Sequence, residues 1–404
     1  MTRYWKLITI TTIIVLTIGT FYISSAMAGN NYPEFVFDKQ SGNEDEVALI
    51  TIHGDYIKGE RGNSLEISSE GTVYANELSF LERLNGIYMG GEMKQLQNNY
   101  RNFMRGKDNI WSTFEDQKRL AYVDINDNYV VDGPREYIFD IEILEKDSEE
   151  TIDFTITIPE KKKYNYVQIE DVQILDNVMK VTTVNHSVNG NEWDSEEIHV
   201  YSVDIANQKL VNDEVIQLSS EQSSAKNSYM YFVQDQSDIG PATYLIFKKE
   251  YMEEEEHADG NYYNESKGSE LITYHLASGE QRPIQLPEGI NILNSFVYLD
   301  DSIIYVHKTT DQGLKVSKFN IESQEIETSE TIKLPANLNE PLNLKIKDGK
   351  LYAVGYEANK NKKAPLLVFD INSGEILYDG IVETKNLTEN QLEHRLYIHD
   401  MEFK

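Results

Sequence analysis

The sequence predicts an all-β protein built from a four-stranded unit that is repeated along the chain. Three observations carry this prediction. Short segments of alternating apolar and polar residues recur along the chain, Tyr is the commonest aromatic residue with 26 copies, and the peptide "FDINSGEI" at 369–376 has several relatives elsewhere. With 404 residues, of which 40% are hydrophobic, the chain can bury a large core.

The peptide at 369–376 has the pattern of two strand ends joined by a tight turn. Gly374, and Gly279 in a related peptide, suit the left-handed backbone that such a turn needs. Gln208 and Gln324 suit it less well, so we expect the turn type to vary between copies. The related peptides are "FNIESQEI" at 319–326, "VDIANQKL" at 203–210, "YHLASGEQ" at 274–281, "VDINDNYV" at 123–130 and, more weakly, "LEISSEGTV" at 65–73.

Each copy is preceded by a further alternating segment that starts at an Asp or Asn turn, such as "DGKLYAVGYE" at 348–357. The unit is therefore strand, turn, strand, variable loop, strand, tight turn, strand. The tight-turn positions 124, 204, 275, 320 and 370 lie 80, 71, 45 and 50 residues apart. A four-stranded unit every about 40 to 50 residues is the period of a β-propeller blade. The extra hairpin segment at 137–158 makes a seventh blade conceivable.

Over about 46–404 the chain resembles β-propellers of the quinoprotein-like and WD40-like kind. The resemblance implies an all-β propeller of about six or seven four-stranded antiparallel blades after one N-terminal hydrophobic helix, and it implies no activity. Two stacked β-sandwiches are the alternative architecture. We expect the C-terminal "RLYIHDMEFK" to pair with "EVALITIHGDY" near the N-terminus, since this pairing removes exposed strand edges.

The N-terminal segment predicts export from the cytoplasm. Arg3 and Lys6 precede an uncharged, largely apolar run, and Ala26-Met27-Ala28 supplies the small residues that a signal peptidase accepts. Residues 1–28 are therefore either a cleaved signal peptide of a secreted protein or a single transmembrane anchor in the cell membrane. Residues 29–45 are expected to be a linker, and 46–404 an extracytoplasmic propeller domain.

The composition excludes several function classes. A net charge of −31 opposes binding to the phosphates of nucleic acids. The chain has no Cys, so it has neither disulfides nor thiolate catalysis. No nucleotide-binding or serine-hydrolase motif is present and Trp is absent from the repeats, so we expect no cofactor and no catalytic residue.

The segment at 92–119 is predicted to be an inserted loop with a helix and a local excess of basic residues. Its function is either to cover the blades with an apolar helix face or to contact a partner or a membrane surface. The candidate binding residues are Lys94, Tyr100, Arg101, Phe103, Arg105 and Trp111.

A second inserted loop is predicted at 249–270, where four consecutive glutamates occur. Such a run is usually solvated, but its oxygens also resemble a loose cation site. The weak metal candidates are Glu254, Glu256, His257 and Asp259. The peptide "DINDN" at 124–128 looks like part of a calcium loop, yet its alignment with the repeats favours a hairpin turn.

The first functional hypothesis is a protein-interaction or sensory module at the cell envelope, without enzymatic activity and with an envelope or membrane protein as its partner. The second is an extracellular carbohydrate-active hydrolase that uses acidic side chains at the propeller mouth. A third is an accessory to a transporter or cell-wall system. The oligomeric state and the ligand do not follow from the sequence.

Overall fold

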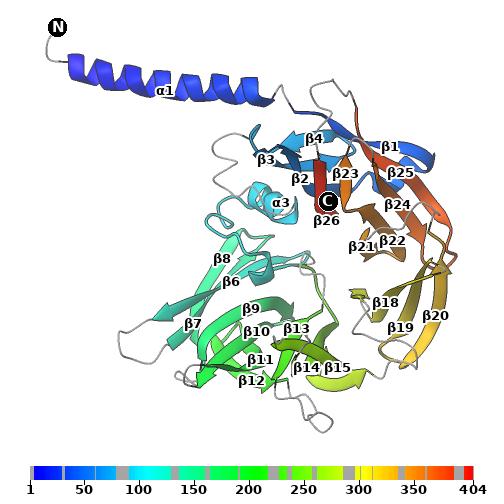
Figure 1. Cartoon of the computed structure of the whole chain (residues 1–404). Helices are drawn as coiled ribbons and strands as arrows, with labels where there is room; N and C mark the ends of the chain where they lie inside the picture. The colour runs from blue at the N-terminus through cyan, green and yellow to red at the C-terminus, as the bar shows by residue number, and fades with distance from the viewer. Residues whose placement is uncertain are drawn as a thin grey trace. The chain divides into compact units, whose positions relative to one another are not determined.

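The computed structural model of the chain consists almost entirely of antiparallel sheets (Figure 1). The structure describes residues 4–29, 32–59, 61–78, 91–128, 136–159, 164–189, 192–216, 227–233, 239–256, 262–284, 296–300, 302–311, 313–334, 342–359, 362–385 and 395–403. Within these residues there are six sheets of four or five strands, which we name A to F. The fold is that of a β-propeller with six blades, as the repeats predict.

The sheets fall into two compact units. Unit 1 comprises 1–94 and 334–404 and holds sheets A and B, and unit 2 comprises 95–333 and holds sheets C to F. The boundary falls within helix α3 (Gly91–Asn99).

Sheets A and B of unit 1 both combine strands from the two ends of the chain. Sheet A has the order β1-β25-β24-β22-β21, and sheet B has the order β23-β26-β2-β3-β4. The strands of sheet A are β1 (Phe35–Gly42), β25 (Ile376–Thr384), β24 (Ala364–Asp370), β22 (Lys350–Gly355) and β21 (Leu342–Lys347). Those of sheet B are β23 (Glu357–Asn359), β26 (Arg395–Phe403), β2 (Ile50–Lys58), β3 (Arg61–Ser68) and β4 (Gly71–Tyr74).

The predicted pairing of the chain ends is confirmed. The C-terminal strand β26 pairs with β2 from Ile50↔Phe403 to Ile57↔Arg395. Strand β1 lies in the segment that was expected to be a linker, and it pairs with β25. A shared apolar core, which includes Phe35, Ile52 and Met401, packs the strands of this unit together.

Sheets C to F of unit 2 follow the chain in order, and each has four strands. Sheet C consists of β5 (Thr113–Glu115), β6 (Arg119–Asn128), β7 (Glu136–Glu145) and β8 (Glu150–Thr157). Sheet D consists of β9 (Tyr164–Leu175), β10 (Val178–Asn189), β11 (Glu192–Asp204) and β12 (Lys209–Val215). Sheet E consists of β13 (Asn227–Phe232), β14 (Tyr244–Glu256), β15 (Tyr262–His275) and β16 (Glu280–Ile284). Sheet F consists of β17 (Phe296–Asp300), β18 (Ile303–Thr310), β19 (Gly313–Asn320) and β20 (Glu325–Ile332).

The tight turns show where the repeat analysis was right and where it was wrong. Gln208 (φ 50°) and Gln324 (φ 59°) adopt the same left-handed conformation as Gly374 (φ 69°), so the turn type does not vary in the way expected. The peptide "DINDN" lies inside strand β6, where Asp124 pairs with Asp140, and is not a hairpin turn. The hairpin at 137–158 therefore belongs to sheet C and makes no seventh blade.

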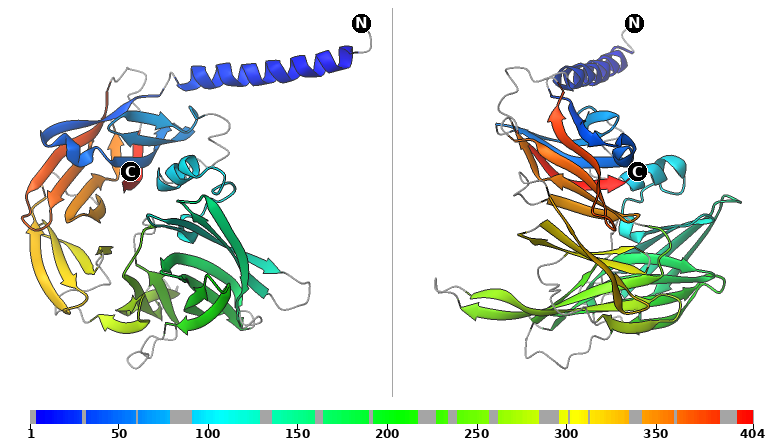
Figure 2. Two further views of the ribbon diagram at one scale, coloured as in Figure 1. Left: turned by 180° about the vertical axis from the view of Figure 1, so that it is seen from behind. Right: turned by 90° about the vertical axis from the view of Figure 1, so that its right-hand side faces the viewer.

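The segment at 249–270 is also not an inserted loop. It forms parts of β14 and β15, which stay paired from Tyr244↔His275 to Glu256↔Tyr262, past the ends of their neighbours β13 and β16 (lime strands, Figure 2). The length of this hairpin, rather than a loop, accounts for the extra residues between the repeats.

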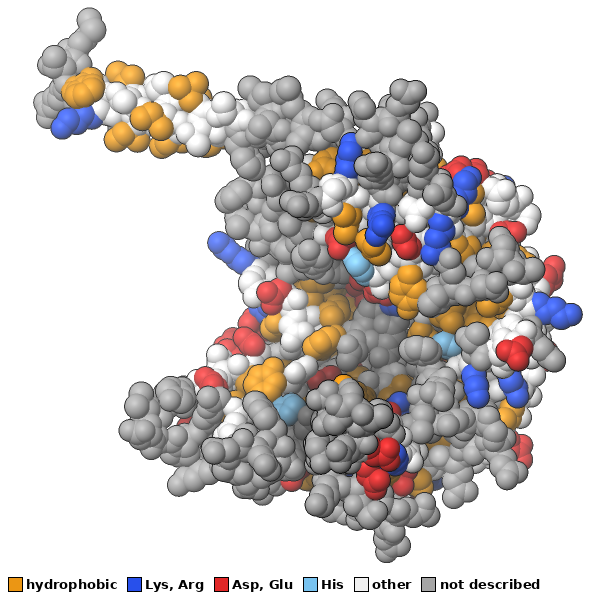
Figure 3. Space-filling model, viewed as in Figure 1, with side chains coloured by type: hydrophobic (Ala, Val, Ile, Leu, Met, Phe, Trp, Pro, Cys, Tyr) orange, Lys and Arg blue, Asp and Glu red, His pale blue; other side chains and the backbone are white. Residues whose placement is uncertain are grey.

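The N-terminal helix α1 (Trp5–Gly29) exposes apolar side chains such as Ile13 and Leu16 (Figure 3). Within the described part of the chain, none of the helices combines the length and the hydropathy needed to span a bilayer. The short helices are η1 (Glu44–Val47) and η2 (Ile110–Ser112).

Candidate functional site

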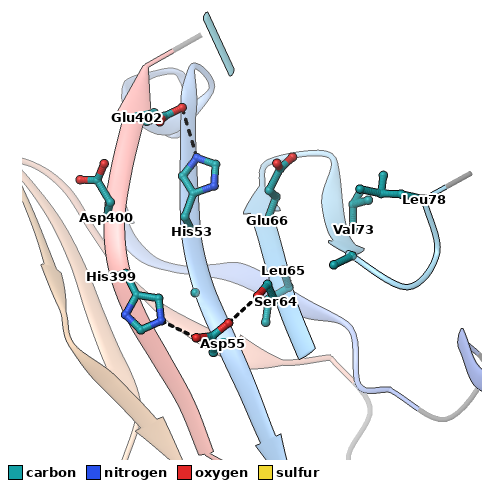
Figure 4. A pocket seen from close by; sticks show the side chains of 12 residues that line it. His53, Asp55, Ser64, Leu65, Glu66, Val73, Leu78, His399, Asp400 and Glu402 are labelled. Carbon is teal, nitrogen blue, oxygen red and sulfur yellow. Dashed lines mark hydrogen bonds and ion pairs between the residues drawn. The ribbon is translucent and has the colours of Figure 1, made fainter. Parts of the chain in front are cut away.

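A cavity of about 220 Å³ opens on one face of sheet B, within unit 1 (Figure 4). One wall is apolar and comes from β3, β4 and the turn after β4. The opposite wall is polar and comes mainly from β2 and β26. The apolar lining is Leu65, Val73, Ala75 and Leu78, and the polar lining is His53, Asp55, Ser64, Glu66, His399, Asp400 and Glu402.

A β-bulge in β26 shapes the polar wall. His53 pairs with Asp400 and Gly54 pairs with Ile398, which leaves His399 as the extra residue between them. A bulge of this kind redirects neighbouring side chains, and both His399 and Asp400 line the cavity. Opposite the bulge, a Cβ on Gly54 would lie 2.4 Å from the carbonyl oxygen of Tyr397, so the strands can approach this closely only with Gly.

Asp55 lies between a serine and a histidine. The Ser64 hydroxyl donates to Asp55 Oδ1 over 2.6 Å, and His399 Nε2 lies 2.8 Å from Asp55 Oδ2. Burial tends to raise the pKa of Asp55, but the hydrogen bonds and the charge of His399 outweigh it and hold the pKa below its usual value. In a Ser–His–Asp triad the histidine lies between the hydroxyl and the carboxylate. Here the carboxylate lies between the other two groups, so the arrangement is not that of such a triad.

Glu402 is the most strongly stabilised acid of the cavity. Its Oε2 accepts a hydrogen bond from the backbone N–H of Gly91 over 2.6 Å and lies 3.2 Å from His53 Nε2. Burial alone would raise the pKa of Glu402, but His53, the Gly91 N–H and the charge of Lys345 together lower it to about 2. Glu402 therefore stays ionised throughout the physiological range.

The remaining acids of the cavity are paired more weakly. Glu66 forms an ion pair with Lys94, and both side chains are about one-third exposed. Asp400 is half-exposed and lies 3.6 Å from Lys345 Nζ. Exposed ion pairs contribute only about 0–1 kcal/mol each, so Glu66 and Asp400 can exchange their partners at little cost.

The protonation pattern of this cavity differs from that of a glycoside hydrolase. Such an enzyme needs one carboxyl group with a raised pKa as its general acid. The pKa values of Asp55 and Glu402 are instead shifted downward. Among the described residues, the one carboxyl group with a raised pKa is that of Glu170 in unit 2, where burial raises it to about 7, and Glu170 is not part of the cavity lining.

The candidate binding residues of segment 92–119 lie in different environments. Lys94, in the first turn of α3, reaches the cavity acid Glu66. The Phe103 side chain is buried, which gives it a packing role, and Arg101 and Arg105 are exposed. The Tyr100 ring lies 5.2 Å from Lys146 Nζ. Trp111 is half-buried in η2, and its backbone N–H donates to Asn109.

Within unit 2 this segment is attached to sheet C by lysines. The buried Lys107 Nζ donates to the Phe103 carbonyl over 2.7 Å and lies 2.9 Å from Glu142 Oε1 of β7. Lys146 Nζ lies 2.5 Å from Glu115 Oε1. Of the segment's own basic residues, Lys94 and Lys107 are therefore used in internal contacts, while Arg101 and Arg105 are exposed.

The weak metal candidates gain no support from the structure. Glu254 and Glu256 lie in β14, but their side chains are outside the description, and so are His257 and Asp259. No group of three or more His, Asp or Glu side chains suited to a metal ion occurs among the residues that the structure describes.

None of the cavity residues is among the site residues predicted from the sequence, and of those predicted residues Lys94 contacts a cavity residue, Glu66. The missing information is the bulge, because His399 and Asp400 read as successive residues of a regular strand with side chains on opposite faces. One signal was available: His53, Asp55 and His399 lie in the two chain-end segments whose pairing was predicted.

Comparisons with known proteins find only distant structural similarities. No family model matches the chain, and no curated protein matches it. TolB from Acinetobacter baumannii is similar with 11% identity and a TM-score of 0.29, over 91% of this chain and 66% of that one. The β-propeller domain of the Trilobed protease from Pyrococcus furiosus is similar with 8% identity and a TM-score of 0.33, over 85% and 84% of the two chains. AztD from Citrobacter koseri is similar with 11% identity and a TM-score of 0.32, over 72% and 73%. Similarities this low give no argument about ligand or partner.

Proposed function

We propose that this protein is a non-enzymatic binding module that accepts a cationic side chain, Arg or Lys, of a partner protein in the cavity of sheet B. The observation that carries the proposal is the pairing of an apolar wall with acids that are held in the ionised state. Asp55 and Glu402 have lowered pKa values, and Leu65, Val73 and Leu78 line the other side. A guanidinium or ammonium group on an apolar stem complements both walls.

The size and charge of the cavity agree with this occupant. A volume of about 220 Å³ is smaller than the roughly 300–1,000 Å³ typical of sites that enclose a whole drug-sized ligand, and it suits a single side chain. The net charge of −31 attracts basic partners over a distance. We propose that the module acts outside the cytoplasm as an interaction or sensory protein at the cell envelope, because Arg3 and Lys6 precede an apolar run that ends in Ala-Met-Ala.

The test is calorimetric titration with Nα-acetyl-arginine methylamide and with its citrulline analogue, which is nearly isosteric and uncharged. We expect saturable binding of the arginine probe, weaker or absent binding of the citrulline probe, and a loss of about two- to five-fold in affinity for Asp400→Asn, the size expected for one partly exposed charge.

Asp153→Asn is the matched control, since Asp153 is an exposed acid of sheet C that does not line the cavity. Its affinity should equal that of the wild type. Equal binding of the two probes, or no binding of either, would contradict the proposal.

A further inference from the structure

The first turn of α3 supplies two groups that neutralise acids of the cavity. The Gly91 N–H donates to Glu402, and the Lys94 ammonium pairs with Glu66. Gly91 and Lys94 are three residues apart, so both groups lie on one side of the first helical turn. Both carboxylates line the cavity, and Figure 4 shows Glu66 and Glu402 near the same end of it.

The two contacts differ in strength. Glu402 is the better shielded acid, with a side chain that is 17% exposed, and it also has His53 as a partner. The Lys94–Glu66 pair is 32% and 29% exposed. A partly exposed Lys–Glu pair is weak and readily exchanged, whereas a carboxylate that receives a helix N-terminal N–H is fixed in position. Lys94 is therefore the replaceable partner.

We propose that Lys94 is a built-in competitor: its ammonium group occupies the place at Glu66 that the cationic group of a ligand takes, and binding displaces it. This inference rests on the proposed function of the cavity. The ligand class is a guanidinium or a primary ammonium on an apolar stem, because only a cation competes with Lys94 for Glu66. Glu402 keeps its contacts, so its negative charge stays in place while the ligand cation replaces Lys94 at Glu66.

The internal competitor makes binding conditional. Because Lys94 is attached to the chain, its ammonium group is present at a high effective concentration near Glu66. A free cation must therefore interact with the cavity more favourably than Lys94 does, through its charge or through its contacts with the apolar wall. A partner that presents Arg in a matching surface satisfies this requirement at low concentration, whereas a small free cation such as the arginine probe displaces Lys94 only at higher concentration. Displacement also removes one of the contacts that hold the first turn of α3, which links occupancy of the cavity to the start of that helix.

The test combines a variant with a measurement on the wild-type chain. Lys94→Met should bind Nα-acetyl-arginine methylamide about two- to five-fold more tightly than the wild type, the gain expected when one partly exposed competing ion pair is removed. Lys39→Met is the matched control, because Lys39 also pairs with a glutamate in unit 1, Glu44, and does not line the cavity. It should leave the affinity unchanged.

In the wild-type chain, acetylation of Lys94 by an amine-reactive ester, followed by mass spectrometry, should increase when the arginine probe is added and stay constant with the citrulline probe. Lys94→Met could bind the arginine probe more tightly merely because the variant lacks a positive charge near the cavity. That electrostatic effect alone would not make Lys94 of the wild-type chain more reactive when the probe is added. If the wild type binds the probe while Lys94→Met binds no more tightly or Lys94 reactivity stays constant, the competitor inference is wrong and the proposed function stands. If neither protein binds the probe, the proposed function fails as well.

Discussion

His199 in sheet D and His399 in sheet B each lie beside an aspartate, at 2.7 Å from Asp213 and 2.8 Å from Asp55, yet their surroundings are opposite. The His199 side chain is 4% exposed and the His399 side chain is 57% exposed. The same residue pair therefore stands in a closed network in one sheet and at an open cavity in the other.

The network of sheet D uses both ring nitrogens of His199. The Tyr164 hydroxyl lies 2.9 Å from His199 Nε2 and 2.8 Å from Glu197 Oε2, Asp213 lies beside Nδ1, and the His199 ring stacks on Tyr201. Four residues from three strands therefore surround the imidazole. In sheet B the bulge places His399 at the surface of a cavity, with Asp400 beside it. A His–Asp pair is thus found in both surroundings, and the adjacent cavity is what makes the pair of sheet B a candidate site.

The largest loss of stability is expected for Gly54→Ala, which disturbs the close approach of β2 and β26 at the bulge. The new Cβ would lie 2.4 Å from the carbonyl oxygen of Tyr397. Because backbone atoms cannot retreat without breaking the β2–β26 pairing, we expect a loss of about 3 kcal/mol or more in the free energy of unfolding, measured by chemical denaturation.

Gly62→Ala is the control for that experiment, because it lies in the neighbouring strand and its Cβ would meet nothing closer than 3.9 Å. Its effect should stay below about 1 kcal/mol. Similar losses for the two variants would show that the close approach at the bulge is not what Gly54 provides.

The next largest loss of stability is expected at one of the two histidines and not at the other. His199→Ala should lower the free energy of unfolding by about 2–3 kcal/mol, because it empties a buried site and leaves the buried Tyr164 hydroxyl and the partly buried Asp213 carboxylate without the imidazole. His399→Ala should cost less than about 1 kcal/mol, since its pair with Asp55 is exposed. If His399→Ala proved the more costly of the two by the same denaturation measurement, the contrast between a closed and an open site would be wrong.

A smaller effect, which depends on pH, is expected for Glu402→Gln. The pKa of Glu402 is lowered from 4.5 to about 2, so the ionised group adds stability above pH 4.5, and this stability is lost as the pH falls toward 2. A pKa lowered this far corresponds to about 3 kcal/mol of stability, but the amide oxygen of glutamine can still accept the Gly91 N–H, so the variant should be about 1–2 kcal/mol less stable than the wild type at pH 6.

This difference in stability should shrink steadily between pH 4.5 and 2, as followed by thermal unfolding across that range. A difference that grows as the pH falls, or one that does not change with pH, would mean that Glu402 is not held in its ionised form.

Much of the fold followed from the sequence because the blades repeat. Alternation and turn residues located the strands, and the chain-end pairing of β2 with β26 was predicted from strand-like patterns alone. The errors have local causes. Gln208 and Gln324 accept a left-handed conformation that favours Gly, because the blade hairpin fixes the backbone there. Turn-type residues in "DINDN" were assigned to a turn, but pairing with β7 keeps them in a strand.

Much less of the candidate site than of the fold could be predicted from the sequence. It depends on one extra residue in β26 and on a glycine opposite it, and both look ordinary in a linear pattern. The segment 92–119 attracted attention because it is basic, but Lys107 uses its charge inside unit 2, and only Lys94 reaches a cavity acid. Long-range pairing of side chains from positions 53–66 and 399–402 requires the three-dimensional register.

The most direct test of the central claim is a crystal structure of the wild-type chain soaked with Nα-acetyl-arginine methylamide. The account predicts the guanidinium within hydrogen-bond distance of Glu66 and Asp400, its methylene groups against Val73 and Leu78, and Lys94 turned away from Glu66. A probe bound on any other surface, or a cavity that stays empty at a saturating probe concentration, would contradict it.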